Sequence, residues 1–255
     1  MINEDSVIGV SQKKVSKLYG EEYAKIYSES DQKKNYSQSI SFRYINNTLE
    51  NICKSFPNKI TILEFGCGTG RWFQSLANWE KIVGIDLSAP MLSFARKKCT
   101  GNIELLEGGV ECFENLKEGS FQFIYSIGVL GEHSPFHIDI LNQFYKLLSD
   151  DGLLLVTIVD AESKPTKKSW RRHIMELIYP FIPSLVQSRL DERWLSNYIP
   201  ISRALEVIKK SGFAINYINH REEDPKDWVG AHYFLGLVKN GSQFQLGRGM
   251  GLVNP

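Results

Sequence analysis

The sequence lacks three features: an excess of one charge, a long apolar run and an apolar leader. Lys and Arg total 30 against 29 Asp and Glu, so the chain carries no global field that would gather nucleic acid or anionic lipid. No run approaches the roughly 20 apolar residues of a membrane-spanning helix, and residues 1–20 are polar. These absences predict a cytoplasmic protein with no stable membrane insertion and no nucleic-acid partner.

The sequence is also poor in cysteine, with only Cys53, Cys67, Cys99 and Cys112. No two of them form a C-x-x-C pair, and no histidine stands at a spacing typical of a zinc site. Thiols spaced in this way are typical of small core residues in a reducing compartment. We therefore expect neither a disulfide framework nor a metal site.

What the sequence does have is an alternation of short apolar runs and helix-like stretches. The apolar runs predict strands at 60–65, 82–85, 103–106, 121–127 and 153–159. The stretches between them predict helices at 71–77, 89–98 and 136–148. Further along, the pattern predicts a helix ended by a C-capping glycine and two late strands, at 202–211, 213–219 and 232–238. This alternation indicates an α/β fold with a parallel sheet that is covered by helices on both faces.

The most specific pattern lies directly after the first strand, where three glycines alternate at Gly66, Gly68 and Gly70. Glycine in such a turn permits positive φ angles and close approach of a ligand, and the amides of the next helix can hold an anionic group. A dinucleotide fingerprint would need glycine where Arg71 stands, and the Gly-Lys-Ser/Thr end of a phosphate loop is absent. Glu64, at the strand end, would repel a pyrophosphate but attract a cofactor with ammonium and sulfonium groups.

The block from 64 to 70 closely resembles the first motif of class I S-adenosylmethionine-dependent methyltransferases. A further block, at 84–88, resembles the next motif of the family and places Asp86 at the end of the second strand. A carboxylate about 20 residues beyond the first motif suits a ribose diol. The resemblance implies S-adenosylmethionine as the cofactor, with Asp86 bonding both ribose hydroxyls. The other contacts that it implies in these two blocks are Glu64, Gly66, Cys67, Gly68, Gly70, Leu87 and Met91.

Two later blocks, at 119–130 and 147–156, also resemble the family. In the block at 119–130, Ser126 and Ile127 would line the cofactor, and the block at 147–156 resembles the family's turn into the fifth strand. The four blocks together cover about 59–160 and follow the order of the family. They imply a Rossmann-like, doubly wound, mostly parallel seven-stranded sheet with an antiparallel late strand, N-terminal helices and a helical insertion after strand five.

Two departures from the family pattern leave alternatives open. The family often has an aspartate after the third strand that binds the adenine amino group, whereas this chain has Gly109 there. The adenine is then held by the Val110 amide or by Glu111. After the fourth strand the family often has Leu-Glu-His, whereas this chain has one extra residue at 130–133. That extra residue leaves the position of His133 open.

Each candidate residue also has a purely structural explanation. Glu64 could stabilise a helix dipole, and Asp86 could be the N-cap of the next helix, although Ser88 could serve there instead. His133 is either a general base that takes a proton from a substrate hydroxyl or a solvated histidine at a helix start. Among the N-terminal tyrosines, Tyr27 is the candidate to close over the methionine end of the cofactor.

The flanking segments divide the chain into five predicted parts. Residues 161–200 contain four prolines and many aromatic and basic residues, which indicates inserted helices that form a lid or contact a partner or membrane. The parts are an N-terminal helical cap at 1–58 with a loop at 28–39, the cofactor-binding half at 59–160, the insertion at 161–200, the C-terminal part of the Rossmann-like domain at 201–240 and a flexible tail at 241–255.

The sequence therefore predicts transfer of a methyl group from S-adenosylmethionine to an oxygen or nitrogen atom of a small-molecule acceptor. The apolar and aromatic insertion favours a small acceptor, and the balanced charge and the lack of a recognisable RNA-binding appendage argue against RNA. Methylation of RNA or protein, and a cofactor-binding protein without catalysis, are the alternatives. The acceptor, the methylated atom and the oligomeric state stay open at this point.

Overall fold

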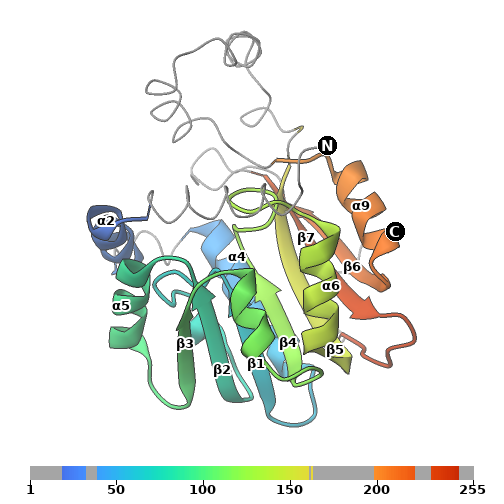
Figure 1. Ribbon diagram of the computed structural model, residues 1–255, viewed down its shortest axis with the longest axis horizontal. Coiled ribbons are helices and arrows are strands. Elements are labelled where there is room, and N and C mark those ends of the chain that lie inside the picture. Colours follow the sequence, from blue (N-terminus) through green and yellow to red (C-terminus); the bar gives the residue numbers. More distant parts are fainter. Residues whose placement is uncertain (1–18, 33–38, 161, 163–197, 222–230, 247–255) are drawn as a thin grey trace, which may run out of the picture.

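The structure is a computed structural model that describes residues 19–32, 39–160, 162, 198–221 and 231–246. It contains a seven-stranded sheet in the order β3-β2-β1-β4-β5-β7-β6 (Figure 1). The strands are β1 (Ile60–Phe65), β2 (Trp79–Asp86), β3 (Ile103–Glu107), β4 (Phe121–Ser126), β5 (Leu148–Val159), β6 (Phe213–Arg221) and β7 (His232–Lys239). The α-helices are α2 (Glu21–Gln32), α4 (Ile40–Lys54), α5 (Ala89–Lys98), α6 (Ile138–Leu147) and α9 (Ile201–Lys210), and the 3-10 helices are η1 (Phe73–Ser75) and η2 (Val110–Asn115). This arrangement confirms the predicted Rossmann-like fold.

The topology of the sheet locates the edge at which a ligand would bind. Strands β1 to β5 run parallel, whereas β7 is antiparallel to its neighbours β5 and β6. The strand order reverses between β1 and β4, and open α/β sheets bind ligands outside the carboxyl ends of the strands at such a reversal. That edge carries Glu64, Asp86 and Ser126, three of the residues for which the sequence predicts a cofactor contact.

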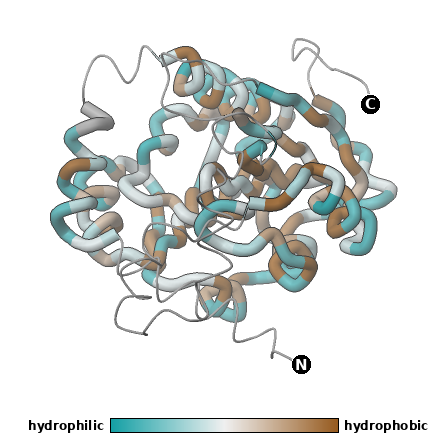
Figure 2. Tube along the Cα trace, turned by 90° about the horizontal axis from the view of Figure 1, so that it is seen from above, coloured by the Kyte–Doolittle hydropathy of each residue, from teal (hydrophilic) through white to brown (hydrophobic). Residues whose placement is uncertain are grey.

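Helices cover the sheet on both faces, and each face has its own apolar core. Helices α6 and α9 pack on one face, where Phe144 and Ile208 are buried. Helix α4 and η1 pack on the other face, with Leu49 and Phe73 in the core. Figure 1 shows α6 and α9 in front of the sheet and α4 behind it, and Figure 2 shows apolar segments concentrated toward the middle of the molecule. Burial on both faces explains why the central strands β1, β4 and β5 contain near-continuous apolar runs in the sequence.

Two helix ends follow directly from the sequence. Ser88 is the N-cap of α5, and its hydroxyl accepts a hydrogen bond from the Met91 N–H at 3.2 Å. Helix α9 ends just before Gly212, which has a φ of 77° and continues the chain in the left-handed conformation. Because Ser88 takes the capping role, Asp86 is available for other contacts.

The helix predicted at 71–77 is wrong, because the structure has only the 3-10 turn η1 there. The chain leaves this turn extended at Leu76 and passes through Asn78 in the left-handed conformation, with a φ of 51°. The Asn78 side-chain amide donates to the carbonyls of Phe56 and Asn58, at 2.9 and 2.8 Å. These contacts hold the corner that leads into β2, so tertiary hydrogen bonds outweigh local helix propensity.

Other boundaries also differ from the prediction. Helix α2 continues to Gln32, so the beginning of the predicted loop at 28–39 is helical. Strand β5 begins at Leu148 because its first residues already pair with the start of β4, ahead of a register shift. The predicted insertion at 161–200 and the tail at 241–255 lie largely outside the described residues.

Candidate functional site

The glycine loop, residues 66–70, lies at the carboxyl edge of the sheet. The Gly66 amide donates to the Ile85 carbonyl at 2.8 Å, which ties the loop to β2. Gly66 has a φ of 80°, and a methyl group on its Cα would lie 2.2 Å from Cγ2 of Val129. Gly68 has a φ of 53°, and a methyl group there would meet no atom within 4 Å. The loop therefore packs tightly against the chain after β4 at Gly66 and is open to a ligand at Gly68.

Asp86 ends β2 directly beside the glycine loop. Its Oδ2 accepts the Gly68 N–H at 2.7 Å, and its Oδ1 accepts the Ser88 N–H at 2.9 Å. Burial raises the pKa of Asp86 above its ordinary value, although the two amide hydrogen bonds act to lower it. Each carboxylate oxygen has a further lone pair. Asp86 is thus held rigidly and can still accept hydroxyl groups from a ligand.

Glu64 lies beneath the glycine loop rather than on its surface. The side chain is 2% exposed, and the Tyr125 hydroxyl of β4 donates to its Oε2 at 2.7 Å. Burial raises the pKa of Glu64 well above its ordinary value, whereas the Tyr125 hydrogen bond and the nearby Arg71 lower it. Any attraction of Glu64 for a cationic ligand therefore acts through the loop and not by direct exposure.

The residues predicted near an adenine ring lie together on the other side of Asp86. The Gly108 amide donates to the Asp86 carbonyl at 2.9 Å, and the Gly109 amide donates to Oε1 of Glu111 at 2.7 Å. The Glu111 carboxylate is thereby drawn back onto its own turn. Val110 begins η2 and packs against the core. Of the remaining predicted neighbours, Leu87 is half-buried and Met91 is buried.

Three predicted contacts turn their side chains into the protein. The Ser126 hydroxyl donates to the Phe65 carbonyl at 2.9 Å, which joins β4 to β1. Cys67 is buried in the core on the α4 face, where burial raises the pKa of its thiol well above the ordinary value. Ile127 packs against the same core. These residues can meet a ligand through their main chain, while their side chains support the sheet edge.

The segment 19–32, here called the N-terminal cover, is attached to three loops of the site. The Ser88 hydroxyl donates to the Tyr19 carbonyl at 2.6 Å, and the Tyr19 hydroxyl lies 2.8 Å from Nε2 of His133. The Tyr27 ring lies 4.1 Å from the guanidinium carbon of Arg71, a cation–π contact. Figure 1 shows α2 beside α5, at the same end of the sheet as the glycine loop. The predicted Tyr27 therefore belongs to a segment that adjoins the loops after β1, β2 and β4.

Comparison with known proteins agrees with this geometry. The family model described as "Methyltransferase domain" matches residues 62–152. An uncharacterized methyltransferase of Oceanobacillus iheyensis is 27% identical over 152 residues, which are 58% of this chain and 69% of the relative. A demethylmenaquinone methyltransferase of the same organism is 27% identical over 147 residues, or 53% of this chain and 60% of that protein. The methyltransferase domain match at residues 62–152 and the order of the sheet support a class I S-adenosylmethionine-dependent methyltransferase. Its cofactor is S-adenosylmethionine.

The fold of this methyltransferase is also found among solved structures. A methyltransferase from Thermotoga maritima, described as a possible histamine N-methyltransferase, superposes with a TM-score of 0.57 at 18% identity. The superposition covers 88% of this chain and 99% of the Thermotoga chain. At this identity the likeness supports the fold alone, which agrees with the sheet order described above.

The loop after β4 of the methyltransferase holds two ionisable side chains side by side. The backbone N–H of His133 donates to the Val129 carbonyl at 2.9 Å, and Nε2 of the His133 ring lies 3.8 Å from Oε1 of Glu132. Burial lowers the pKa of His133 to about 4 and raises that of Glu132 to about 7. Sequence reasoning considered His133 and missed Glu132, although the acidic residue before the histidine was visible at 130–133. The tight turn that brings both to the site required tertiary structure.

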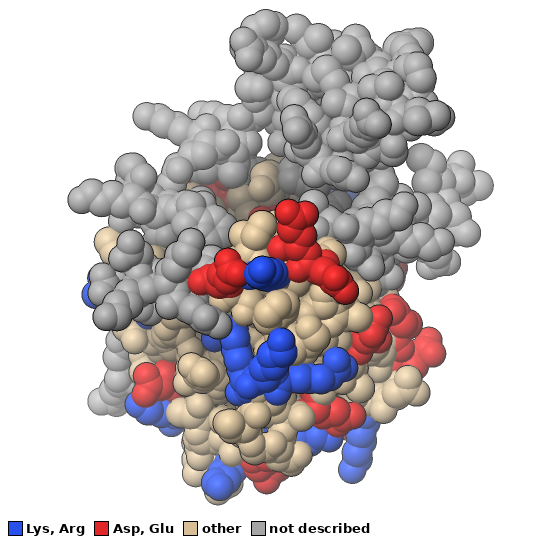
Figure 3. Space-filling model, turned by 90° about the vertical axis from the view of Figure 1, so that its left-hand side faces the viewer, with Lys and Arg blue, Asp and Glu red and all other residues tan. Residues whose placement is uncertain are grey.

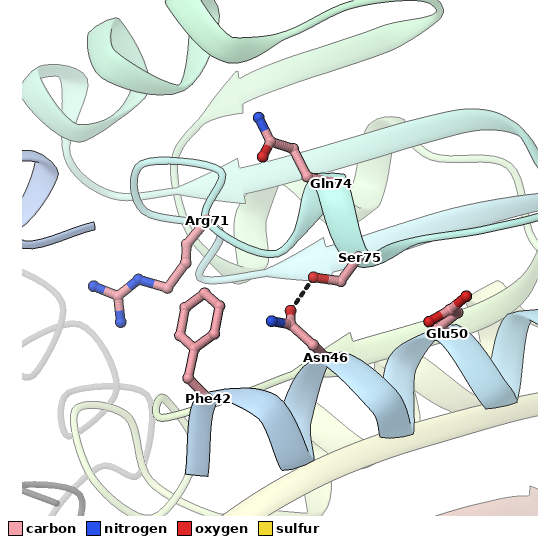
Figure 4. A pocket seen from close by; sticks show the side chains of 6 residues that line it. All are labelled: Phe42, Asn46, Glu50, Arg71, Gln74 and Ser75. Carbon is pink, nitrogen blue, oxygen red and sulfur yellow. Dashed lines mark hydrogen bonds between the residues drawn. The ribbon is translucent and has the colours of Figure 1, made fainter. Parts of the chain in front are cut away.

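A groove of about 330 Å³ lies between α4 and η1 (Figure 4). Figure 4 shows the Phe42 ring beside Arg71 and the hydrogen bond from the Ser75 hydroxyl to the Asn46 side chain. The residues that line the groove are Phe42, Asn46, Glu50, Arg71, Gln74 and Ser75. None of them is a predicted cofactor contact. The groove therefore adjoins the cofactor site through Arg71 without coinciding with it.

Charges on the face that carries α2 and α5 are of both signs (Figure 3). Helix α2 has Glu21 and Glu22 in its first turn, and the last turn of α5 contains Arg96, Lys97 and Lys98. Each group complements the dipole of its own helix. This face of the methyltransferase thus presents adjoining acidic and basic groups rather than a field of one sign.

Membrane-spanning helices and metal centres are both absent from the described part of the chain. Within those ranges, no helix combines the length and apolar character required to cross a bilayer. In the same residues, no group of three His, Cys, Asp or Glu side chains is arranged to hold a metal ion. All four cysteines are free thiols.

Proposed function

We propose that this methyltransferase transfers the methyl group of S-adenosylmethionine to an oxygen or nitrogen atom of a small-molecule acceptor. The observation that carries the proposal is the pairing of Gly68, open toward a ligand, with Asp86, whose carboxylate is fixed beside it by two amides. This pair fits a nucleoside with a free ribose diol. The demethylmenaquinone methyltransferase among the relatives is named for a small-molecule acceptor, which supports the same class here.

The contribution of the protein to such a reaction is mainly geometric. When bound, the cofactor supplies an electrophilic methyl group. Asp86 would hold the ribose, and the main chain of the glycine loop would adjoin the remainder of the nucleoside. The N-terminal cover would exclude water through Tyr19 and Tyr27, which are anchored to His133 and Arg71. Holding two reactants in line removes much of the entropic barrier, and exclusion of water protects the reacting groups.

The methionine carboxylate needs a partner other than a helix N-terminus, because η1 replaces the predicted helix after the glycine loop. We assign that role to Arg71, which follows Gly70 directly and is close enough to lower the pKa of Glu64. Arg43, a second arginine that could pair with this carboxylate, is exposed on α4. A guanidinium group suits a carboxylate because it can donate two parallel hydrogen bonds.

A general base is needed only if the acceptor must lose a proton. His133, the base proposed from the sequence, is neutral near pH 7 because burial lowers its pKa to about 4. Its Nε2 already faces the Tyr19 hydroxyl at 2.8 Å. That contact makes His133 well suited to hold the N-terminal cover, and the neighbouring Glu132 is the other candidate for proton transfer.

Two measurements test the proposed function. Calorimetry should detect binding of S-adenosylmethionine and of S-adenosylhomocysteine, and Asp86→Ala should abolish both while Glu114→Gln, an exposed control, should not. Incubation with a panel of small phenols, naphthoquinols, carboxylic acids and amines should give acceptor-dependent S-adenosylhomocysteine. Binding without turnover on any acceptor would favour a non-catalytic binding protein, and turnover only on RNA or protein would favour those acceptors. Absence of binding would refute the proposal.

A further inference from the structure

The half-buried carboxyl group of Glu132 has no part in the binding of ribose or methionine proposed above. It lies in the loop after β4. The backbone N–H of His133 closes this loop by donating to the Val129 carbonyl at 2.9 Å. The Val129 side chain fills the space that the absent Cβ of Gly66 leaves, so this loop rests on the glycine loop. Glu132 Oε2 lies 3.7 Å from the place that a methyl group on Gly128 would take. The carboxyl group therefore stands over the main chain at the end of β4.

The other two carboxyl groups at this edge are placed differently. Asp86 accepts two amides beside β2, on the ribose side. Glu64 accepts the Tyr125 hydroxyl beneath the glycine loop. The Glu132 side chain is 26% exposed and projects from the loop after β4. The three carboxyl groups thus belong to β2, to β1 and to the loop after β4, which are neighbours at the carboxyl edge of the sheet.

We propose that the Glu132 carboxylate is the countercharge of the cofactor's sulfonium group and that Glu132 becomes protonated when the methyl group leaves. The inference rests on the proposed function, since it assigns Glu132 to the same site. S-adenosylmethionine carries one positive charge more than S-adenosylhomocysteine and is otherwise nearly identical to it. A nearby cation stabilises a buried carboxylate, and loss of that cation favours the neutral acid.

Atoms and charges balance in this step. The acceptor oxygen or nitrogen forms a bond to the methyl carbon, and the carbon–sulfur bond breaks with its electron pair left on sulfur. The O–H or N–H bond of the acceptor breaks, and its proton passes to an oxygen of Glu132. The site begins with a carboxylate and a sulfonium and ends with a carboxylic acid and a thioether. Its net charge is unchanged, so no isolated charge is left in a buried place.

The surroundings allow Glu132 to take both forms near neutral pH, because burial raises its pKa to about 7. Tyr19, Tyr23 and His133 are the titratable groups near Glu132. Two charged groups act on these tyrosines in turn, Asp86 on Tyr19 and Arg71 on Tyr23. Burial raises the pKa of Tyr19 and lowers that of His133 to about 4. Both of these neighbours are therefore neutral between pH 6 and 8, where Glu132 changes charge.

The test compares the charged cofactor with the neutral product, so no acceptor is needed. Isothermal titration calorimetry at pH 7 in buffers of different ionisation enthalpy measures the protons that are released on binding. S-adenosylmethionine should release more protons than S-adenosylhomocysteine, because its charge ionises Glu132. The ratio of the two affinities should shift toward S-adenosylmethionine by up to about tenfold between pH 6 and 8. Glu114→Gln should keep both effects, and Glu132→Gln should lose both.

Equal proton release by the two ligands in the wild-type protein would overturn the inference, whatever the variants do. A pH-dependent affinity ratio that persists in Glu132→Gln would also overturn it, because another group would then carry the charge. Failure of the proposed function gives a different result: neither ligand would bind at any pH. Should Glu132→Gln not fold, the wild-type comparison decides alone.

Discussion

The Tyr19 hydroxyl lies 2.8 Å from Nε2 of His133, and this contact joins the N-terminal cover to the loop after β4. The two residues are far apart in the sequence, and the Ser88 hydroxyl also anchors Tyr19 by donating to its carbonyl at 2.6 Å. Burial lowers the pKa of His133 to about 4, so the imidazole is neutral above about pH 5. The contact should therefore not change across the physiological range.

Removal of either partner should loosen the N-terminal cover. Tyr19→Phe and His133→Gln should each reduce hydrogen-exchange protection of α2 and weaken S-adenosylhomocysteine binding. Because the two groups share one hydrogen bond, a double-mutant cycle should show a coupling free energy of about 1 kcal/mol. Strictly additive effects would show that the two side chains act independently.

Replacement of Glu132 should make the apo protein more stable at alkaline pH. The carboxyl group has an ordinary pKa of 4.5 and a folded-state pKa of about 7, so the folded protein binds more protons than the unfolded chain between these values. The stability that Glu132 contributes is therefore present below pH 4.5 and lost as the pH rises through 7. Glu132→Gln should raise the free energy of unfolding by up to about 3 kcal/mol at pH 8 relative to its effect at pH 4.5.

Urea unfolding of the wild-type protein and Glu132→Gln at several pH values measures this difference. Glu114→Gln is the matched control, because its carboxyl group is exposed and it makes the same change of side chain. A stability difference between wild type and Glu132→Gln that did not vary with pH would contradict the raised pKa.

Alanine at two glycines of one loop should affect different properties, the stability at Gly66 and the cofactor affinity at Gly68. Gly66→Ala adds a methyl group 2.2 Å from Val129 at a φ of 80°, so it should destabilise the fold by about 3 kcal/mol. Gly68→Ala adds only backbone strain, of about 1 kcal/mol, because its methyl group points into open space. That space is the one proposed for the cofactor. Gly68→Ala should therefore lower S-adenosylhomocysteine affinity at least about tenfold while the protein stays folded, as thermal unfolding and calorimetry would show.

Loss of the Tyr125 hydroxyl should lower the stability of the protein without changing its fold. Tyr125→Phe keeps the ring but leaves the buried Glu64 without its hydrogen bond from β4, which should cost about 2 kcal/mol in urea unfolding. Tyr145→Phe is the control, because Tyr145 is half-buried and its ring contacts Phe213 and Lys239 through its faces and edges. We expect the control to change stability by less than about 0.5 kcal/mol. Equal effects of the two substitutions would show that the Glu64 hydrogen bond contributes little.

The local sequence pattern was sufficient to predict the strands and part of the candidate site. The apolar runs that become the central strands β1, β4 and β5 are buried on both faces, so they stand out in the sequence as near-continuous apolar segments. Asp86 and the glycine loop were also visible, because a tight turn restricts residue type at each position. The helix expected after Gly70 was wrong, since its end depends on hydrogen bonds from Asn78 to the carbonyls of Phe56 and Asn58.

Local patterns predicted the strands and the positions of Glu64 and Asp86 at strand ends, because these depend on a few adjacent residues, and the resemblance of the motifs predicted the cofactor class. Tertiary packing was needed to bury Glu64, to bring Tyr19 against His133 and to place Glu132 beside them. Those outcomes depend on how segments distant in the sequence pack together, and burial then sets the pKa of each group through the loss of solvation.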